Sequence, residues 1–395
     1  MPTVFPNELV DRIIDHLHND AVVLSACALV RSSWIPTVRY HRFRRVLLGP
    51  PASIHSFNAL LQTSPDVAPY VSHLDILHNW SDDKNMAPLC TLLSTTPRLR
   101  GLHLGYMDLE PDKFRAICFA LPTSLEHVEL NHLYLRTGTL GDLVLLWSRL
   151  PRLRSFILIG DTKINGPEIP EEYTRSDTKL LSATELQLLW QIPHFDVIAG
   201  WFCSQNVPAQ LRACSLSLSS TEYVAPIARL LRETGPALER FEFDLGSGEV
   251  VSGVSGLQVF YPCDLAQCTN LRELYLSGTA FGEHFDGSML VLCMSHILAH
   301  VRAPGVRTLV FNITGHSPDV LRRSIAQLGS VATAISRNRA FDALERVMVR
   351  LCDVFGAPVS EDLYAPVRNS FKGFEERGLL TVRGAKLGGT AQWLN

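Results

Sequence analysis

One apolar pattern, Leu-x-x-Leu-x-Leu, recurs along most of the chain. Copies start about 26 to 30 residues apart at first and up to about 38 apart toward the C-terminus. The copies begin at Leu99, Leu125, Leu153, Leu211, Leu238, Leu271, Val306 and Leu344, with weaker ones at Val71 and Ala183. Each x-Leu-x-Leu segment alternates with period two, which indicates a half-buried strand.

Segments with helical periodicity lie between these strands. Phe114, Ile117, Cys118 and Leu121 follow the i, i+3, i+4, i+7 spacing of an amphipathic helix. One unit is therefore a strand plus a helix, and it cannot bury its apolar face alone. Stacked units predict an α/β fold in which a parallel sheet carries its helices on the outer face.

The repeated unit resembles the leucine-rich repeat over roughly residues 65 to 356. That family has Asn or Cys three residues after the last Leu of the motif, where this chain has varied side chains. The residues at that position are Met107, Leu133, Asp161, Ser219, Gly246, Thr279, Thr314 and Cys352. We therefore expect an irregular solenoid, with loop insertions at 160–179 and 246–256.

The first 40 residues lack the repeat and predict three short helices. Pro6, Leu9, Ile13 and Leu17 can lie along one side of the first helix, whereas Val10 and Ile14 can face the second. Asp20 is a candidate N-cap for that second helix. The third segment begins at 33–34 and is expected to end near Pro36. Three short helices build only a shallow core, so this module is expected to need a partner.

This segment resembles the F-box, a module that closes with Val-x-x-x-Trp. The matching residues are Phe5, Pro6, Glu8, Leu9, Ile13, Leu17, Val30 and Trp34. By resemblance, these residues bind a Skp1-like linker and through it a cullin, and the repeats select a protein substrate of the ubiquitin ligase. The implied domains are an F-box at 1–45, a solenoid at 46–356 and a capping segment at 357–395.

Substrate contacts are expected on the strand residues that alternate with the core leucines. These are His103, Glu129, Ile157, Gln187, Ser215, Glu242, Tyr275, Val310 and Met348. Arg240, Asp244 and Glu273 flank the later ones. We expect contacts to concentrate around Glu242 and Tyr275, because an aromatic residue beside mixed charge is a frequent composition of binding hot spots.

We find no enzymatic motif in this sequence. A formal net charge of −3 gives no global reason to expect nucleic-acid binding. There is no P-loop, G-x-G-x-x-G or G-x-S-x-G motif, so we expect a protein that is not an enzyme and needs no cofactor. The alternatives are an F-box scaffold that promotes no ubiquitination and an enzyme on an irregular α/β fold.

Two local clusters have competing interpretations. Cys293, His296 and His300 could bind zinc, with Cys263 and Cys268 upstream. A plain repeat helix explains them better, so no metal is expected. The basic run 39–45 could bind phosphate or nucleic acid. We favour a solvated strand at the junction between F-box and solenoid.

The cysteine pattern and the N-terminus predict a cytoplasmic or nuclear protein. The nine cysteines occur singly, mostly within apolar runs, as reduced buried cysteines do. No signal peptide and no membrane-spanning stretch is evident. Asn79 and Asn312 match the glycosylation pattern by chance in this interpretation.

Overall fold

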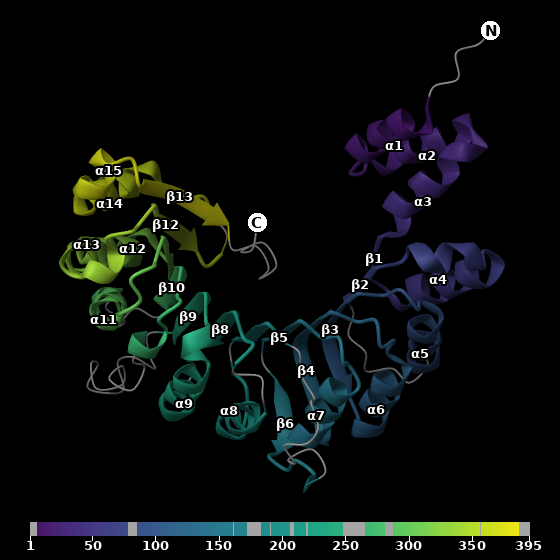
Figure 1. Ribbon diagram of the computed structural model, residues 1–395, viewed down its shortest axis with the longest axis horizontal. Coiled ribbons are helices and arrows are strands. Elements are labelled where there is room, and N and C mark those ends of the chain that lie inside the picture. Colours follow the sequence, from purple (N-terminus) through teal and green to yellow (C-terminus); the bar gives the residue numbers. More distant parts are fainter. Residues whose placement is uncertain are drawn as a thin grey trace. The chain divides into compact units, whose positions relative to one another are not determined.

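The computed structural model describes residues 6–77, 85–160, 162–171, 183–189, 191–205, 209–218, 220–247, 265–280, 287–355 and 357–386. The chain forms two compact units, Met1–Ser182 and Ala183–Asn395. Both units are built from parallel strands that alternate with helices (Figure 1).

Unit 1 begins with a helical module made of α1 (Asn7–His16), α2 (Ala21–Val30), the 3-10 turn Ser32–Trp34 and α3 (Ile35–Phe43). Asp20 caps α2, since its carboxylate accepts hydrogen bonds from the backbone N–H groups of Val22 and Val23. The expected end near Pro36 was wrong, because Pro36 lies in the first turn of α3, where a missing N–H costs nothing. The basic run therefore lies mostly on a helix.

A parallel ladder follows the module in the order β1 (Arg45–Leu48), β2 (His73–Leu77), β3 (Gly101–Leu109), β4 (His127–Thr139) and β5 (Ser155–Ile159). Four helices accompany these strands, namely α4 (Pro51–Thr63), α5 (Met86–Thr95), α6 (Pro111–Ala120) and α7 (Leu140–Ser148). The insertion expected as a loop at 160–179 contains a short strand, β6 (Lys163–Gly166), which pairs with the far part of β4.

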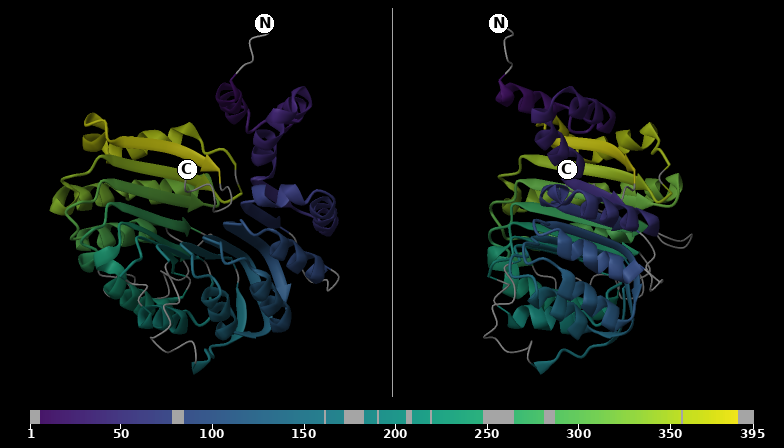
Figure 2. Two further views of the ribbon diagram at one scale, coloured as in Figure 1. Left: turned by 45° about the vertical axis from the view of Figure 1, so that its right-hand side comes forward. Right: turned by 90° about the vertical axis from the view of Figure 1, so that its right-hand side faces the viewer.

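Unit 2 contains a second parallel ladder with its helices along one face (Figure 2). Its strands are β7 (Glu185–Leu189), β8 (Ala213–Ser217), β9 (Arg240–Ser247), β10 (Glu273–Ala280), β11 (Thr308–Gly315), β12 (Arg346–Asp353) and β13 (Leu380–Lys386). Its helices include α8 (Phe195–Ser204), α9 (Val224–Thr234), α11 (Gly287–His300), α12 (Pro318–Ala326), α13 (Leu328–Arg337), α14 (Tyr364–Ser370) and α15 (Lys372–Glu376).

The strand pairing confirms the expected fold class, an α/β solenoid of leucine-rich-repeat type. All ten repeat copies coincide with strands, and their leading residues, such as Leu99, Leu125 and Leu271, are fully buried. The junction strand expected at 39–45 was misplaced, because α3 continues to Phe43 and the strand, β1, covers Arg45–Leu48. Two further strands, β6 and β13, were not anticipated. The last of these lies in the C-terminal segment and pairs with β12. Most of the loop expected at 246–256 lies outside the described residues.

Candidate protein-binding surfaces

The helical module divides the apolar side chains of α1 between an inner and an outer side. Val10 and Ile14 are 5% and 0% exposed and form a small core with Leu24 on α2 and Val38 on α3. The same helix leaves Leu9 44% exposed and Ile13 50% exposed. This division is what helical periodicity predicts for the two sides of α1.

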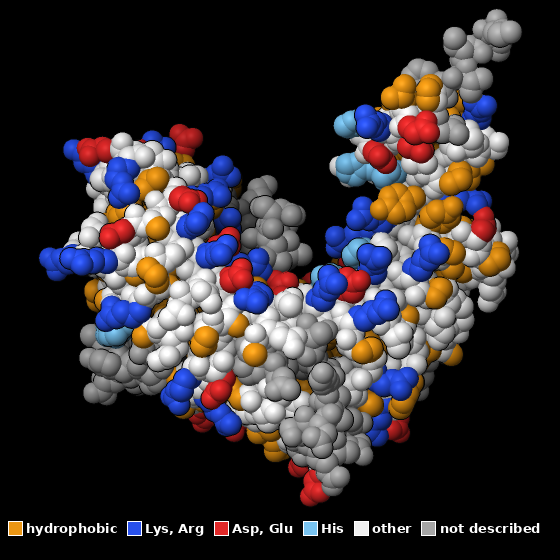
Figure 3. Space-filling view, viewed as in Figure 1, with side chains coloured by type: hydrophobic (Ala, Val, Ile, Leu, Met, Phe, Trp, Pro, Cys, Tyr) orange, Lys and Arg blue, Asp and Glu red, His pale blue; other side chains and the backbone are white. Residues whose placement is uncertain are grey.

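The other residues matched to the F-box are distributed between the surface and the core of the module. Pro6, Glu8 and Val30 are exposed, Leu17 is half-buried, and Trp34 is half-buried against the core. Phe5 lies outside the described residues. On α2, Val22 and Leu29 are also exposed, at 79% and 88%. We call the exposed side chains Leu9, Ile13, Val22, Leu29 and Val30 the module's outer apolar set. Figure 3 shows apolar side chains at the surface of the helical module.

Polar contacts hold α1 against α3. The hydroxyl of Thr37 donates to Oδ1 of Asp11 at 2.5 Å, and Nε2 of His41 lies 2.7 Å from Oδ1 of Asp15. These contacts lie on a third side of α1, away from Leu9 and Ile13. The orientation of α1 is therefore set by internal contacts that leave the outer apolar set uncovered within unit 1.

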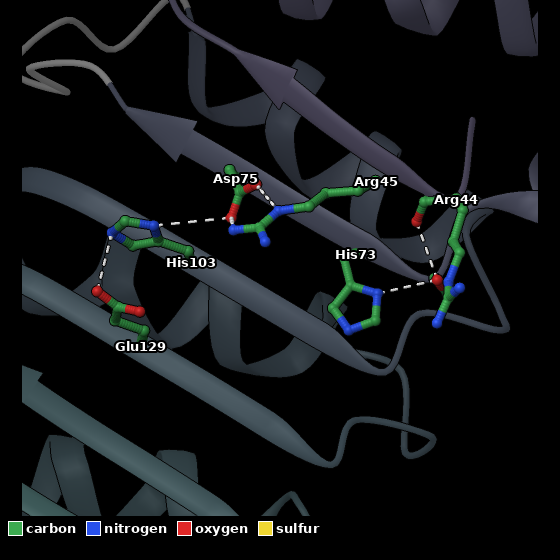
Figure 4. A network of polar contacts seen from close by, with 7 residues as sticks. Arg44, Arg45, His73, Asp75, His103 and Glu129 are labelled. Atoms are coloured by element: carbon green, nitrogen blue, oxygen red, sulfur yellow. Dashed lines mark hydrogen bonds and ion pairs between the residues drawn. The ribbon is translucent and has the colours of Figure 1, made fainter. Parts of the chain in front are cut away.

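The open face of the sheet, opposite the helices, carries a polar ladder in unit 1 (Figure 4). Arg45 on β1 donates to Asp75 on β2 from Nε at 2.6 Å. The His103 ring on β3 has Nδ1 3.7 Å from Asp75 and Nε2 3.4 Å from Glu129 on β4. Sequence reasoning placed His103 and Glu129 on this face, and their register confirms that they are neighbours. It missed Arg45 and Asp75.

Burial and charge act oppositely on the two carboxylates of this ladder. Burial opposes ionisation of Asp75, but its contacts with His103 and Arg45 outweigh that effect and lower its pKa to about 2. Burial raises the pKa of Glu129, and the attraction of His103 only partly offsets this. Asp75 is thus a firmly ionised centre of the ladder.

Left-handed backbone recurs at one position of three successive repeats in unit 1. Tyr106, His132 and Gly160 have φ values of 56°, 54° and 84°. The Tyr106 and His132 rings stack with centroids 5.0 Å apart. A Cβ at Gly160 would lie 2.7 Å from the His132 ring, so glycine is required beside it. Each of these positions precedes the one where the family has Asn or Cys, and no residue preference in the sequence signals this conformation.

In unit 2 the expected substrate residues lie on two neighbouring strands. The register pairs Glu242 with Tyr275 and Arg240 with Glu273 across β9 and β10. Tyr275 donates from its hydroxyl to Oε2 of Glu273 at 3.1 Å, and Arg240 donates to Oε1 of Glu185 on β7 at 2.5 Å. The four residues are therefore brought together on the open face. Sequence reasoning gave Asp244 only a flanking place on this face and did not single out Asn312, although both lie close by.

The zinc candidate residues lie on one repeat helix. Cys293 on α11 is fully buried, and this burial raises the pKa of its thiol to about 12. Nδ1 of His300 lies 2.9 Å from the backbone carbonyl oxygen of His296. Within the described ranges, no group of three or more His, Cys, Asp or Glu side chains could hold a metal ion. Cys263 lies outside those ranges.

None of the helices in the described part of the chain is both long and apolar enough to span a membrane. No family model and no curated protein matches this sequence.

Three solved structures are similar to this chain at low sequence identity. The leucine-rich repeat-containing protein LegL7 from Legionella pneumophila is 16% identical, with 83% of this chain and 97% of that one covered and a TM-score of 0.44. A chain from the complex of Rad7 and Elc1 in yeast is 11% identical, with 98% and 97% covered and a TM-score of 0.36. A chain from the TLR13–ssRNA13 complex is 14% identical, with 74% and 51% covered and a TM-score of 0.22.

Proposed function

We propose that this protein is a substrate-recognition adaptor of an SCF-type ubiquitin ligase. Residues 1–45 act as an F-box that docks on a Skp1-like linker and, through it, on a cullin. The strand face of residues 46–356 binds a protein substrate, and 357–395 cap the solenoid. The protein performs no bond chemistry itself. It raises the effective concentration of the substrate near a ubiquitin-charged enzyme.

The observation that carries the proposal is the two-sided burial of α1. Val10 and Ile14 fill the small core of the module, while Leu9 and Ile13 on the same helix remain about half exposed. A short helix with two apolar sides has one more apolar side than its own module can bury. Large apolar surfaces left exposed mark interaction sites or aggregation risks, and a docked linker protein would bury Leu9 and Ile13.

The composition of the open strand face supports the substrate half of the proposal. Paired acidic and basic side chains and one tyrosine line this face in unit 2, with buried apolar side chains on the opposite side of each strand. Such mixed polar and aromatic surfaces are typical of specific protein recognition. The residues proposed to contact substrate are Arg240, Glu242, Glu273 and Tyr275.

The proposed docking of the helical module on a Skp1-like linker is tested by placing charged side chains in the outer apolar set. Leu9→Asp with Ile13→Asp should abolish co-purification with a Skp1-like protein, because burying two unpaired carboxylates in an apolar interface is costly. The melting temperature should stay within about 2 °C, because both side chains are exposed. Leu292→Asp is the matched control, since Leu292 is a helical leucine in unit 2 that is 37% exposed. Skp1 binding retained by the double variant would refute the docking surface.

A scaffold that binds the linker without promoting ubiquitination is the second candidate. It shares the same docking surface, so mutations in the module cannot separate the two functions. Reconstitution with a cullin and a ubiquitin-conjugating enzyme can separate them. The adaptor predicts ubiquitin chains on a protein captured by the strand face, lost with Leu9→Asp and Ile13→Asp. The scaffold predicts capture without transfer.

A further inference from the structure

Two carboxylates on β9, Glu242 and Asp244, face the open side of the sheet and hydrogen-bond to neutral donors. Ser215 donates to Oε2 of Glu242 at 3.2 Å, and Ser217 donates to Oδ2 of Asp244 at 3.0 Å. The backbone N–H of Gly246 donates to Oδ1 of Asp244 at 3.1 Å. Among the described residues, no lysine or arginine nitrogen forms an ion pair with either carboxylate. Neutral donors therefore make the hydrogen bonds of two half-buried acids that lie two residues apart on one strand, while the charges of Arg240 and Arg350 attract Glu242 without an ion pair.

A third acceptor lies in the same row of the sheet. The register aligns Asp244 on β9 with Ser277 on β10 and Ser277 with Asn312 on β11. Asn312 is 4% exposed, and its Nδ2 donates to the Ser277 hydroxyl at 3.0 Å. Its Oδ1 is buried and accepts no hydrogen bond from any described residue. A buried acceptor without a donor is unfavourable, so this oxygen indicates a missing donor.

The residues around these acceptors limit what can satisfy them. Tyr275 lies between Glu242 and Val310 in the next row, where its ring can contact a cation. The guanidinium of Arg240 pairs with Glu185, and Arg350 on β12 stands beside Asn312. Arg350 bounds the acceptor group on the β12 side. A positively charged ligand is therefore directed away from β12, over Glu242 and Asp244 on β9, Tyr275 on β10 and Asn312 on β11.

We propose that Glu242, Asp244 and Asn312, beside Tyr275, form a site for a lysine or arginine side chain of a protein partner. An ammonium group has three donors and no acceptor, and a guanidinium has five, so either matches a set of acceptors only. Bonds between charged donors and carboxylates are also stronger than neutral ones. This inference rests on the part of the proposed function in which the strand face binds substrate, and it does not depend on linker docking.

The probe is an immobilised library of nonapeptides with a central lysine, compared with twin libraries that carry arginine or acetyl-lysine at that place. The full chain should be captured at least about fivefold better by the lysine or arginine library than by the acetyl-lysine library, because acetylation removes the charge. The ratio between lysine and arginine libraries identifies the preferred cation. Equal capture by all three libraries, or capture abolished by 1 mM Ca²⁺ that itself binds saturably, would overturn the site.

The variant pair that tests the site is Glu242→Gln with Asp244→Asn, which keeps shape and removes charge. It should lose the preference for cationic peptides. Asp319→Asn with Glu361→Gln is the control, since it removes the same charge from exposed positions of unit 2. An unchanged preference in the first pair, or an equal loss in the control pair, would show nonspecific attraction only.

Two further variants test the site independently of the folding of the double amide variant and of linker docking. Should the double amide variant fold poorly, Tyr275→Leu retains both carboxylates and should lower capture about threefold; unchanged capture would contradict the site. Leu9→Asp with Ile13→Asp should lose the Skp1-like linker and keep the cationic preference. Failure of the linker proposal and failure of this site are therefore distinguished in one set of measurements.

Discussion

Arg45 and Asp75 form a two-point ion pair across β1 and β2, with Nε–Oδ2 at 2.6 Å and Nη2–Oδ1 at 3.2 Å. Arg45 follows α3 closely, so the pair joins the start of the solenoid to the end of the helical module. The Arg45 side chain is 68% exposed, whereas Asp75 is buried. Solvent therefore screens the pair only from one side.

The contribution of Asp75 to stability should depend on pH. Its pKa in the folded protein, about 2, lies below the value of an unfolded chain, near 3.9. Its ionisation therefore stabilises the fold above about pH 4, and this contribution is lost as pH falls through about 2. At pH 7, Asp75→Asn should lower the free energy of unfolding by about 1–2 kcal/mol after discounting for the exposed Arg45.

Urea denaturation of both proteins across pH 2 to 7 checks this expectation. The difference between wild type and Asp75→Asn should shrink toward low pH. Asp112→Asn is the control, because that carboxylate is 95% exposed and should change stability little at any pH. A difference that stays constant down to pH 2 would mean that Asp75 acts through packing rather than charge.

Ionisation of Glu242 and Asp244 should destabilise the fold, which is the opposite of its effect at Asp75. Burial raises the pKa of both carboxyl groups, so their charged forms are disfavoured in the folded state at pH 7. Lowering the pH toward their folded pKa values should remove this cost. At pH 7, Glu242→Gln with Asp244→Asn should melt no lower than wild type. A clear fall in melting temperature would show that both charges are needed for folding rather than kept for binding.

Alanine substitutions at Gly160 and Gly329 test whether Gly160 has the left-handed backbone and Gly329 the helical backbone described above. Gly160 has φ +84° and no space for a Cβ beside His132, so Gly160→Ala should cost about 1–2 kcal/mol or more. Gly329 lies in α13, where an added Cβ would meet nothing within 4 Å, and Gly329→Ala should stabilise by about 0.5–1 kcal/mol. Chemical denaturation measures both; effects of equal sign would contradict the assignment.

The C-terminal segment is expected to close the end of the unit 2 core. Phe371 is fully buried, and the centroid of its ring lies 6.2 Å from the ring centroid of Phe311 on β11. Phe371→Ala should therefore cost about 3 kcal/mol, as truncation of a buried aromatic ring usually does. Phe355→Ala provides the comparison, because Phe355 is 81% exposed. Similar effects of the two substitutions on unfolding would mean that 357–395 contribute no core.

The strands that could be predicted from sequence are those flanked by neighbours on both sides. In copies such as Leu271, Leu274 and Leu276, one face is fully buried, so apolar residues must recur with period two. The strands β1 and β13 each have a single partner strand in the described ladder. Such edge strands tolerate polar residues, and 380–386 shows little alternation for that reason.

The residues on the binding surfaces could also be predicted only in part from the sequence. Period-two alternation placed Glu242 and Tyr275 on the open face, and helical periodicity separated Leu9 from Val10. Neither period predicts which side chains meet across strands that are about 26 to 38 residues apart in the sequence. The contact of Arg45 with Asp75 and the row that joins Asp244 to Asn312 depend on register between neighbouring repeats, and register is visible only in the folded chain.

The central claim, that the outer apolar set docks a Skp1-like linker, is tested most directly by calorimetric titration of the full chain with that linker. We predict saturable binding with one linker per chain at micromolar concentrations or below. A negative heat-capacity change should accompany it, because apolar surface is buried. Leu9→Asp with Ile13→Asp should remove the signal, and Leu292→Asp should not. Absence of any binding by the wild-type chain at micromolar concentrations would contradict the account.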